Sequence, residues 1–406
     1  MPTPGRVAIG YSNAAHCLTH LFMLLYPTAV LGLEREFHLP YGELLSLSLG
    51  GFILFGLGAL PAGWLADKWS EIGMLATLLF GMGASAVLTG LAPTPLWIAV
   101  GLSLIGLFGA IYHPVGIAMV VRHAEKRGRA LGINGVSGGV GLALGPLVAG
   151  TLMDLWSWRA AFIVPGLAAI GVGALFLLGA RRAGLRDLRV DVHPQPEVSS
   201  QAMVSAFLTL TVVTMMAGLI FQSTSVALPK IFAQRLHLFT GGSGAASVGG
   251  FVTIVYLGAA SVQVVGGLLA DRLPLKWVYV AAYTLQVPLI LLAAGLSDWP
   301  LVGVAMGMVL LQNGAAPAES SLYARYSPAR WRATAFGLKF VVSLGVSALA
   351  VPLVALIYDR TGGFYWLFIS MAAFATMAAA VGLLLPGEGA TAAAPARPAA
   401  VAGGSD

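Results

Sequence analysis

The stretch GWLADK at residues 63–68 ends one long apolar run, and GLLADR at residues 267–272 ends another. Their aspartates, Asp67 and Asp271, are 204 residues apart in a chain of 406 residues. A repeat at the midpoint of an apolar chain indicates a membrane protein built from two related halves. Two further pairs, each 205 residues apart, support the same repeat: Gly132 with Gly337, and Asp154 with Asp359.

The composition is that of an integral membrane protein, whose partner is the lipid bilayer. Hydrophobic residues make up 58% of the chain and charged residues 9%, whereas soluble domains carry about 25% charged residues. The 52 glycines suit helices that pack closely within lipid. Cys17 is the one cysteine and excludes an internal disulfide. The first apolar run is too long for a signal peptide and lacks a small-residue cleavage site, so we expect it to remain as a span.

Apolar runs of about 20 residues predict membrane-spanning helices. We expect an all-α membrane protein with twelve of them, near residues 9–33, 44–66, 72–91, 96–121, 130–153, 160–179, 204–228, 246–270, 277–296, 300–324, 334–357 and 364–385. They divide into two pseudo-symmetric six-helix bundles, joined by a polar linker and followed by a tail whose composition predicts disorder. The expected segments are the N-terminal bundle at 1–179, the cytoplasmic linker at 180–203, the C-terminal bundle at 204–385 and the tail at 386–406.

The basic residues predict the orientation of the spans. If both termini are cytoplasmic, 16 of the 22 Lys and Arg residues lie on the cytoplasmic side, as the positive-inside rule requires. The net charge of +6 is therefore a topology signal, and we expect no nucleic-acid partner. Lys339 falls within a span, and five basic residues lie outside: Arg35, Arg159, Lys230, Arg235 and Arg360.

Both copies of the repeated motif fall at the predicted cytoplasmic end of a span, the second and the eighth. A carboxylate there can bind the free N–H groups at the start of a neighbouring helix. We expect Asp67 to do so at the eleventh span and Asp271 at the fifth, in one conformation only. The alternative is a plain charge that ends a span. The expected gating residues are Gly63, Asp67, Lys68, Gly267, Asp271 and Arg272.

The repeated residues resemble the loop motif of the major facilitator superfamily, and the resemblance covers nearly the whole chain. It implies the major facilitator fold and transport by alternating access. The first copy departs from the family pattern, because Ser70 and Glu71 stand where the family usually has Gly and a basic residue.

The fifth span resembles the antiporter motif of exporters in that superfamily. Its glycines let another helix approach closely, and Pro146 removes a helical hydrogen bond. The resemblance implies export rather than import, and ordinary glycine-rich packing is the alternative. The residues that carry it are Gly132, Gly141, Gly145, Pro146 and Gly150, with Ala149 in place of one glycine.

A further resemblance is to the fosmidomycin-resistance branch of the superfamily. It rests on FGAIYHP at residues 108–114 and on His16, His20 and Tyr26-Pro27 in the first span. That branch implies proton-coupled export of small polar drugs. The branch tends to carry an acid in the first span where this chain has His20, so the proton carrier stays open.

Five ionisable side chains within the predicted spans are candidates for substrate binding or proton coupling. Charge inside a membrane is unfavourable, so such residues tend to be functional. His16 and His20 are four residues apart, hence on one helix face, and His113 lies at a similar depth. Glu319 and Lys339 share a depth in the second half.

Several roles stay open for these side chains. The histidines can carry protons because imidazole titrates near neutral pH. They can also bind substrate, bind a transition metal, or stay neutral and hydrogen-bonded to the backbone. Glu319 is the rival proton carrier, unless it forms a structural ion pair with Lys339. We expect no cofactor and no resident metal.

The sequence excludes two other classes of membrane protein. None of the five lysines stands in a Gly-x4-Gly-Lys phosphate loop, and no His-Glu pair exists for a His-Glu-x-x-His protease. We therefore expect no enzyme, but a secondary transporter that exports a small organic molecule in exchange for protons. We expect it to act as a monomer in a bacterial inner membrane. The alternatives are a proton-coupled importer of an organic solute or of a transition metal, a polytopic enzyme of another kind, and a membrane sensor with a carrier fold.

Overall fold

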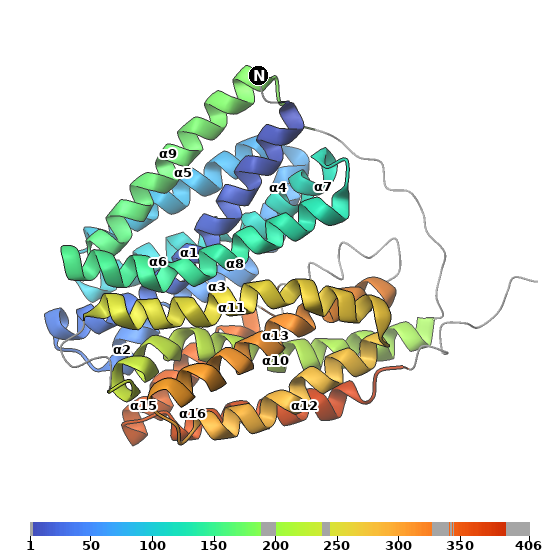
Figure 1. Ribbon diagram of the computed structural model, residues 1–406. Coiled ribbons are helices and arrows are strands. Elements are labelled where there is room, and N and C mark those ends of the chain that lie inside the picture. The colour runs from blue at the N-terminus through green and yellow to red at the C-terminus, as the bar shows by residue number, and fades with distance from the viewer. Residues whose placement is uncertain are drawn as a thin grey trace, which may run out of the picture.

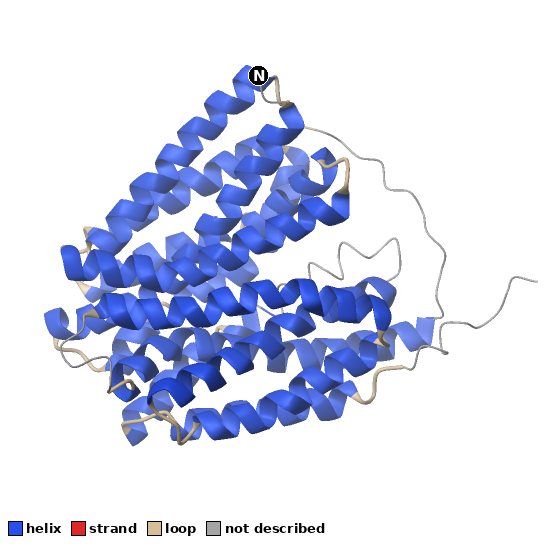
Figure 2. Ribbon diagram, in the orientation of Figure 1, coloured by secondary structure: helices blue, strands red, loops and turns tan. Residues whose placement is uncertain are grey.

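The computed structural model describes residues 3–187, 200–237, 244–326, 341, 343 and 345–386. Within these residues every regular element is a helix (Figure 2). The helices of the first half are α1 (Pro4–Phe37), α2 (Tyr41–Ser46), α3 (Leu49–Leu57), α4 (Ala59–Lys68), α5 (Glu71–Gly90), α6 (Pro95–Gly109), η1 (Tyr112–Gly116), α7 (Ile117–His123), α8 (Arg127–Leu155) and α9 (Ala160–Ala183). Those of the second half are α10 (Ser200–Arg235), α11 (Ala245–Arg272), α12 (Leu275–Ala293), α13 (Asp298–Tyr326), α15 (Ala350–Thr361) and α16 (Tyr365–Gly382).

The predicted all-α membrane architecture is confirmed. Ten of the described helices are long and apolar enough to cross a membrane, and an eleventh span results if α2 and α3 are counted together with α4. The remaining expected span, at 334–357, lies partly outside the described residues. Most of the expected linker, at 188–199, and the tail at 387–406 also lie outside them. Helical structure continues into both ends of the expected linker.

The second span differs from the expected single helix at 44–66. The helix breaks at Gly58, and the segments on its two sides differ in direction by 43°. Pro61 explains the break, because it has no N–H to donate to the carbonyl of Leu57 four residues earlier. An apolar run in the sequence shows that a segment enters lipid, but it does not show where the helix bends.

The two halves meet along α8 and α11, which lie side by side (Figure 1). Glycines allow their backbones to approach closely. A Cβ added at Gly150 would lie 2.2 Å from the carbonyl oxygen of Ala245, and one added at Gly249 would lie 2.2 Å from that of Pro146. Only glycine at positions 150 and 249 therefore allows the two helices to pack this closely.

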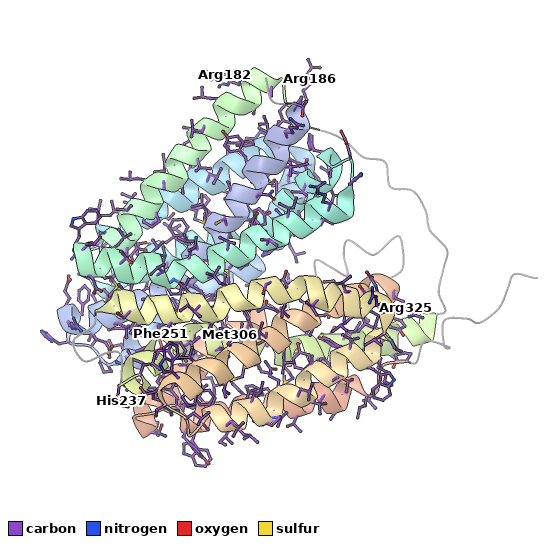
Figure 3. The ribbon with its side chains drawn as sticks, viewed as in Figure 1. Arg182, Arg186, His237, Phe251, Met306 and Arg325 are labelled. Carbon is purple, nitrogen blue, oxygen red and sulfur yellow. The ribbon has the colours of Figure 1, made fainter. Side chains whose placement is uncertain are left out.

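The bundle has two ends, which we call the terminal face and the far face. The terminal face contains the start of α1 and the side chains of Arg182, Arg186 and Arg325, and the far face contains His237 (Figure 3). At the far face the halves are joined by the ion pair of Glu34 with Lys230, whose nearest atoms are 2.6 Å apart.

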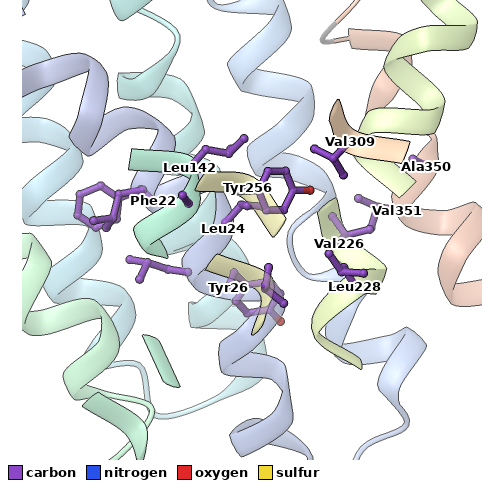
Figure 4. Close-up of a cluster of buried hydrophobic side chains, with 14 of the residues drawn as sticks. Phe22, Leu24, Tyr26, Leu142, Val226, Leu228, Tyr256, Val309, Ala350 and Val351 are labelled. Carbon is purple, nitrogen blue, oxygen red and sulfur yellow. The ribbon is translucent and has the colours of Figure 1, made fainter. Parts of the chain in front are cut away.

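Buried apolar side chains from both halves continue this contact into the bundle (Figure 4). Leu24 and Tyr26 of α1 are buried, as are Val226 and Leu228 of α10 and Tyr256 of α11. Because lipid is as apolar as these side chains, close packing rather than the hydrophobic effect holds them together.

Candidate functional site

The three histidines singled out in the sequence come together in the first half. His16 and His20 lie on α1, and His113 lies on η1. Their ring centroids are 4.8 Å apart for His16 and His20, 5.8 Å for His16 and His113, and 5.6 Å for His20 and His113. The common depth inferred from the sequence is therefore accompanied by direct contact between the rings.

His16 is held by contacts with α8 and η1. Its Nδ1 lies 2.7 Å from the carbonyl oxygen of Asn134 on α8, and its ring stacks on that of Tyr112 at 4.3 Å. The Asn134 amide in turn donates to the Tyr112 hydroxyl at 2.6 Å. A Cβ at Gly138 would lie 2.5 Å from His16 Nε2. The ring thus fills a fitted space between α1, η1 and α8.

His113 lies on a π-helical turn that the sequence analysis did not expect within the span at 96–121. Pro114 provides the cause, because its nitrogen cannot donate the regular i to i−4 hydrogen bond. Turns of this kind occur frequently at functional sites. The turn places the His113 ring 5.9 Å from that of Phe55 and beside the two histidines of α1.

His20 is half-buried, and its Nδ1 has no hydrogen-bond partner among the described residues. A cavity of about 40 Å³ lies close by, lined by Thr19, Phe55, Gly109 and mostly apolar neighbours. This volume is too small for an organic solute. No group of three His, Cys, Asp or Glu side chains in the described part of the chain is placed to hold a metal ion.

The second half contains a larger polar pocket of about 150 Å³. Glu319 lies in its wall, and its Oε2 accepts a hydrogen bond of 2.6 Å from the Tyr279 hydroxyl. Lys339, the expected partner of Glu319, lies outside the described residues. The polar side chains that line the pocket include Thr214, Gln222, Tyr283, Gln312, Asn313 and Glu319.

The amides of this pocket were missed in the sequence. Gln222 is 2% exposed, and its Nε2 has no hydrogen-bond partner among the described residues. By contrast, Gln312 donates to the carbonyl of Ala217 at 2.7 Å. An unpaired buried amide is unfavourable by about 1–3 kcal/mol, so Gln222 favours a ligand that accepts a hydrogen bond. Amide side chains inside apolar runs, such as Gln312-Asn313, were the signal that could have found the pocket.

The repeated motif lies at the terminal face in both halves. Asp67 and Asp271 are exposed, and Lys68 sits over the ring of Trp64 at 4.4 Å. The start of the eleventh span, expected opposite Asp67, lies outside the described residues. In the described part, no hydrogen bond joins Asp271 to the first turn of α8. The expected gating contacts concern the conformation in which this face is closed, and they stay a prediction.

The two positions that depart from the family motif have defined contacts. Ser70 caps α5, since its hydroxyl accepts a hydrogen bond of 2.9 Å from the N–H of Gly73. Glu71 forms an ion pair with Arg122 of α7. The ion pair joins the third and fourth spans at the terminal face.

The glycines of the antiporter-like motif on α8 have different surroundings. A Cβ at Gly141 would lie 1.9 Å from the carbonyl oxygen of Cys17 on α1, and one at Gly145 would lie 2.7 Å from another backbone oxygen of α1. Gly150 packs on α11, whereas a Cβ at Gly132 would meet nothing within 4 Å. Gly141, Gly145 and Gly150 are thus required for close helix packing, and Gly132 is not.

Comparison with known proteins gives the family. The sequence profile of the Major Facilitator Superfamily matches residues 14–252 and 210–403. This chain belongs to that superfamily. Solved structures share its fold: a bacterial homolog of the human lysosomal transporter Spinster, in an inward-facing and occupied conformation, aligns with a TM-score of 0.79 and 16% identity over 95% of this chain and 97% of that one. The peptide transporter POT in complex with sulfate aligns with a TM-score of 0.76 and 16% identity over 95% and 96% of the two chains.

Relatives of this superfamily member include resistance and transport proteins. The puromycin resistance protein pur8 of Streptomyces alboniger is 31% identical over 152 residues, which cover 36% of this chain and 29% of the relative. The probable actinorhodin transporter of Streptomyces coelicolor is 28% identical over 42% of this chain and 30% of the relative. These matches span less than a third of those relatives. The methyl viologen resistance protein SmvA of Salmonella typhimurium is 27% identical over 89% of this chain and 69% of the relative.

Proposed function

We propose that this Major Facilitator Superfamily member is a secondary active transporter. It exports a small organic molecule across a bacterial inner membrane in exchange for protons. The observation that carries the proposal is a pair of polar sites in otherwise apolar halves: the histidine cluster in one and the pocket around Glu319 in the other. Polar and ionisable groups within a membrane are unfavourable and tend to mark a transport pathway.

The first half provides the proton site. His20 and His113 are half-buried and take up the proton, while His16 is held by Asn134 and Tyr112 and keeps the cluster in place. Histidine is the residue most often used to gain and lose a proton under physiological conditions. The neighbouring cavity is too small for an organic solute, which suits a site that exchanges protons only.

The second half provides the substrate site. Its pocket combines the unpaired amide of Gln222 with the carboxylate of Glu319, and Phe221 and Tyr283 add aromatic surface. Such a pocket suits a ring compound that carries hydrogen-bonding groups. Puromycin, actinorhodin and methyl viologen, which appear in the names of the relatives, are all ring compounds. The rings that they share support export of a ring compound.

The proposal also includes the orientation of the protein in the membrane. We assign the terminal face to the cytoplasm, because the predicted spans put 16 of the 22 Lys and Arg residues of the sequence on the side of the termini and five on the other side. The segments 1–179 and 204–385 move against each other, and one chain suffices for the cycle. Since the halves are joined at the far face, this conformation loads its substrate from the cytoplasm. Protonation of the histidines from outside then returns the empty carrier.

Transport by variants in vesicles with an imposed pH gradient tests the proposal, with puromycin and methyl viologen as the first probes. We expect His113→Ala to abolish transport driven by the gradient and to leave downhill exchange of the probe intact, because only the proton carrier is lost. If Glu319→Gln has this effect instead, while His113→Ala transports normally against a gradient, the histidine assignment is wrong.

The same vesicles distinguish the alternatives. Accumulation of a probe on the side of the terminal face would indicate import rather than export. A sensor with a carrier fold would bind a probe without moving it under either gradient. Assignment to the fosmidomycin-resistance branch stays a prediction, and fosmidomycin therefore belongs among the probes.

A further inference from the structure

Two carboxylates at the far face each bind the start of a helix in the opposite half. Asp154, at the end of α8, accepts hydrogen bonds from the N–H groups of Ala245 and Ala246 at 2.9 and 2.8 Å. These are the first two residues of α11. Asp359, near the end of α15, accepts a hydrogen bond of 3.1 Å from the N–H of Gly42, the second residue of α2. Both contacts therefore connect a helix end in one half with a helix start in the other.

The two contacts are related by the internal repeat of the chain. Asp154 and Asp359 are 205 residues apart, and the glycines opposite them, Gly42 and Gly244, are 202 residues apart. In the first contact the acid belongs to the first half, and in the second it belongs to the second half. A contact that occurs twice, with the roles of the halves exchanged, belongs to the boundary between the halves rather than to either bundle.

Each contact depends on a glycine for space rather than for backbone conformation. A Cβ at Gly244 would lie 2.1 Å from an Asp154 carboxylate oxygen, and one at Gly42 would lie 2.2 Å from an Asp359 carboxylate oxygen. Gly244 has a φ of −73°, which any residue adopts. Only the approach of the carboxylate explains why these positions lack a side chain.

The carboxylates match the free N–H groups and the positive end of the helix dipole. They lie at the same face as the ion pair of Glu34 with Lys230 and the hydrogen bond from the Tyr41 hydroxyl to the carbonyl of Val226, at 3.1 Å. All four aspartates are exposed, but among the described residues only Asp154 and Asp359 accept hydrogen bonds from a helix start in the opposite half; Asp67 and Asp271, at the terminal face, do not.

We infer that Asp154 and Asp359 are two symmetry-related latches that close the far face, and that both must release before this face opens. They are the counterpart, at the opposite end of the molecule, of the gating proposed for Asp67 and Asp271. Each conformation of the transporter is then held by a carboxylate pair at its closed end. The inference rests on alternating access, but its test requires no substrate and can fail while transport stands.

Distances between spin labels, measured by pulsed electron paramagnetic resonance in lipid nanodiscs, test the latches. The background is Cys17→Ser, which removes the one natural cysteine. A far-face pair at Leu96→Cys and Trp299→Cys and a terminal-face pair at Glu125→Cys and Leu273→Cys use exposed positions in each half. The far-face distance reports closure by the latches, and the terminal-face distance should change in the opposite sense.

We expect Asp154→Ala and Asp359→Ala each to raise the ratio of molecules open at the far face to molecules closed there about fivefold. This is the effect expected from the loss of one helix cap. Because the two contacts share no residue, the double variant should raise it about 25-fold. Gly244→Ala and Gly42→Ala should act in the same direction, since they displace the carboxylates without removing them. Glu43→Gln is the matched control, an exposed acid beside Gly42, and should leave both distances unchanged.

Unchanged distances in the double variant would overturn the inference, because the contacts would then persist through the cycle as rigid caps. The same conclusion follows if the control shifts the distances as much as the aspartate variants do. If all four latch variants fail to give a folded, monodisperse protein, the contacts serve folding rather than gating, which also overturns it.

Discussion

Two glycines of the antiporter-like motif on α8, Gly141 and Gly132, should respond in opposite ways to substitution by alanine. One substitution should lower the stability of the protein and the other should raise it. A Cβ at Gly141 would lie 1.9 Å from the carbonyl oxygen of Cys17, whereas ordinary contact begins near 3.4 Å. The helices would have to separate by about 1.5 Å, and a backbone oxygen cannot move aside as a side chain can. At Gly132 a Cβ meets nothing within 4 Å.

We expect Gly141→Ala to destabilise the protein by about 1–3 kcal/mol, the usual effect of overpacking, and by the upper part of that range because the obstacle is backbone. Gly132→Ala should instead stabilise it by about 0.5–1 kcal/mol, since alanine loses less chain entropy in a helix. The difference corresponds to a separation of roughly 5 °C in Tm between the two variants.

A thiol-reactive maleimide that fluoresces on reaction provides the assay in detergent. Cys17 is the one cysteine in the chain and is half-buried in this seam, so its labelling during a temperature ramp reports the seam directly. Tryptophan fluorescence gives an independent Tm for each variant. If Gly141→Ala is at least as stable as Gly132→Ala in both measurements, the packing role assigned to the motif is wrong.

Two further predictions concern the terminal face. Asp67→Asn should shift the carrier toward the conformation open at this face, because the charge that binds the facing helix start is lost. Turnover should fall more than expression. Undiminished transport of a probe by this variant would count against the gating role of Asp67. A reporter fused after Pro386 should be active only if it is functional in the cytoplasm, because both termini are expected there; activity of a reporter that works only in the periplasm would reverse the topology and the direction of transport derived from it.

The sequence by itself determined the membrane class, most of the spans and the internal repeat. Hydropathy is a local property, so runs of apolar residues show which segments enter lipid whatever their neighbours are. The repeat, seen in the motifs at 63–68 and 267–272, indicated two halves because duplicated segments fold alike. Helix geometry also placed His16, His20 and His113 at one depth, since depth depends only on rise per residue.

The tertiary structure decided which groups meet. The rings of the three histidines touch because α1, η1 and α8 pack together, and no periodicity shows that packing. The pocket around Glu319 collects side chains from several helices. The contacts of Asp154 with α11 and of Asp359 with α2 join residues 91 and 317 positions apart. Within lipid, helices associate through shape and hydrogen bonds rather than through hydrophobicity. A local sequence pattern therefore shows that a helix spans the membrane, but only the tertiary structure shows which helices it packs against.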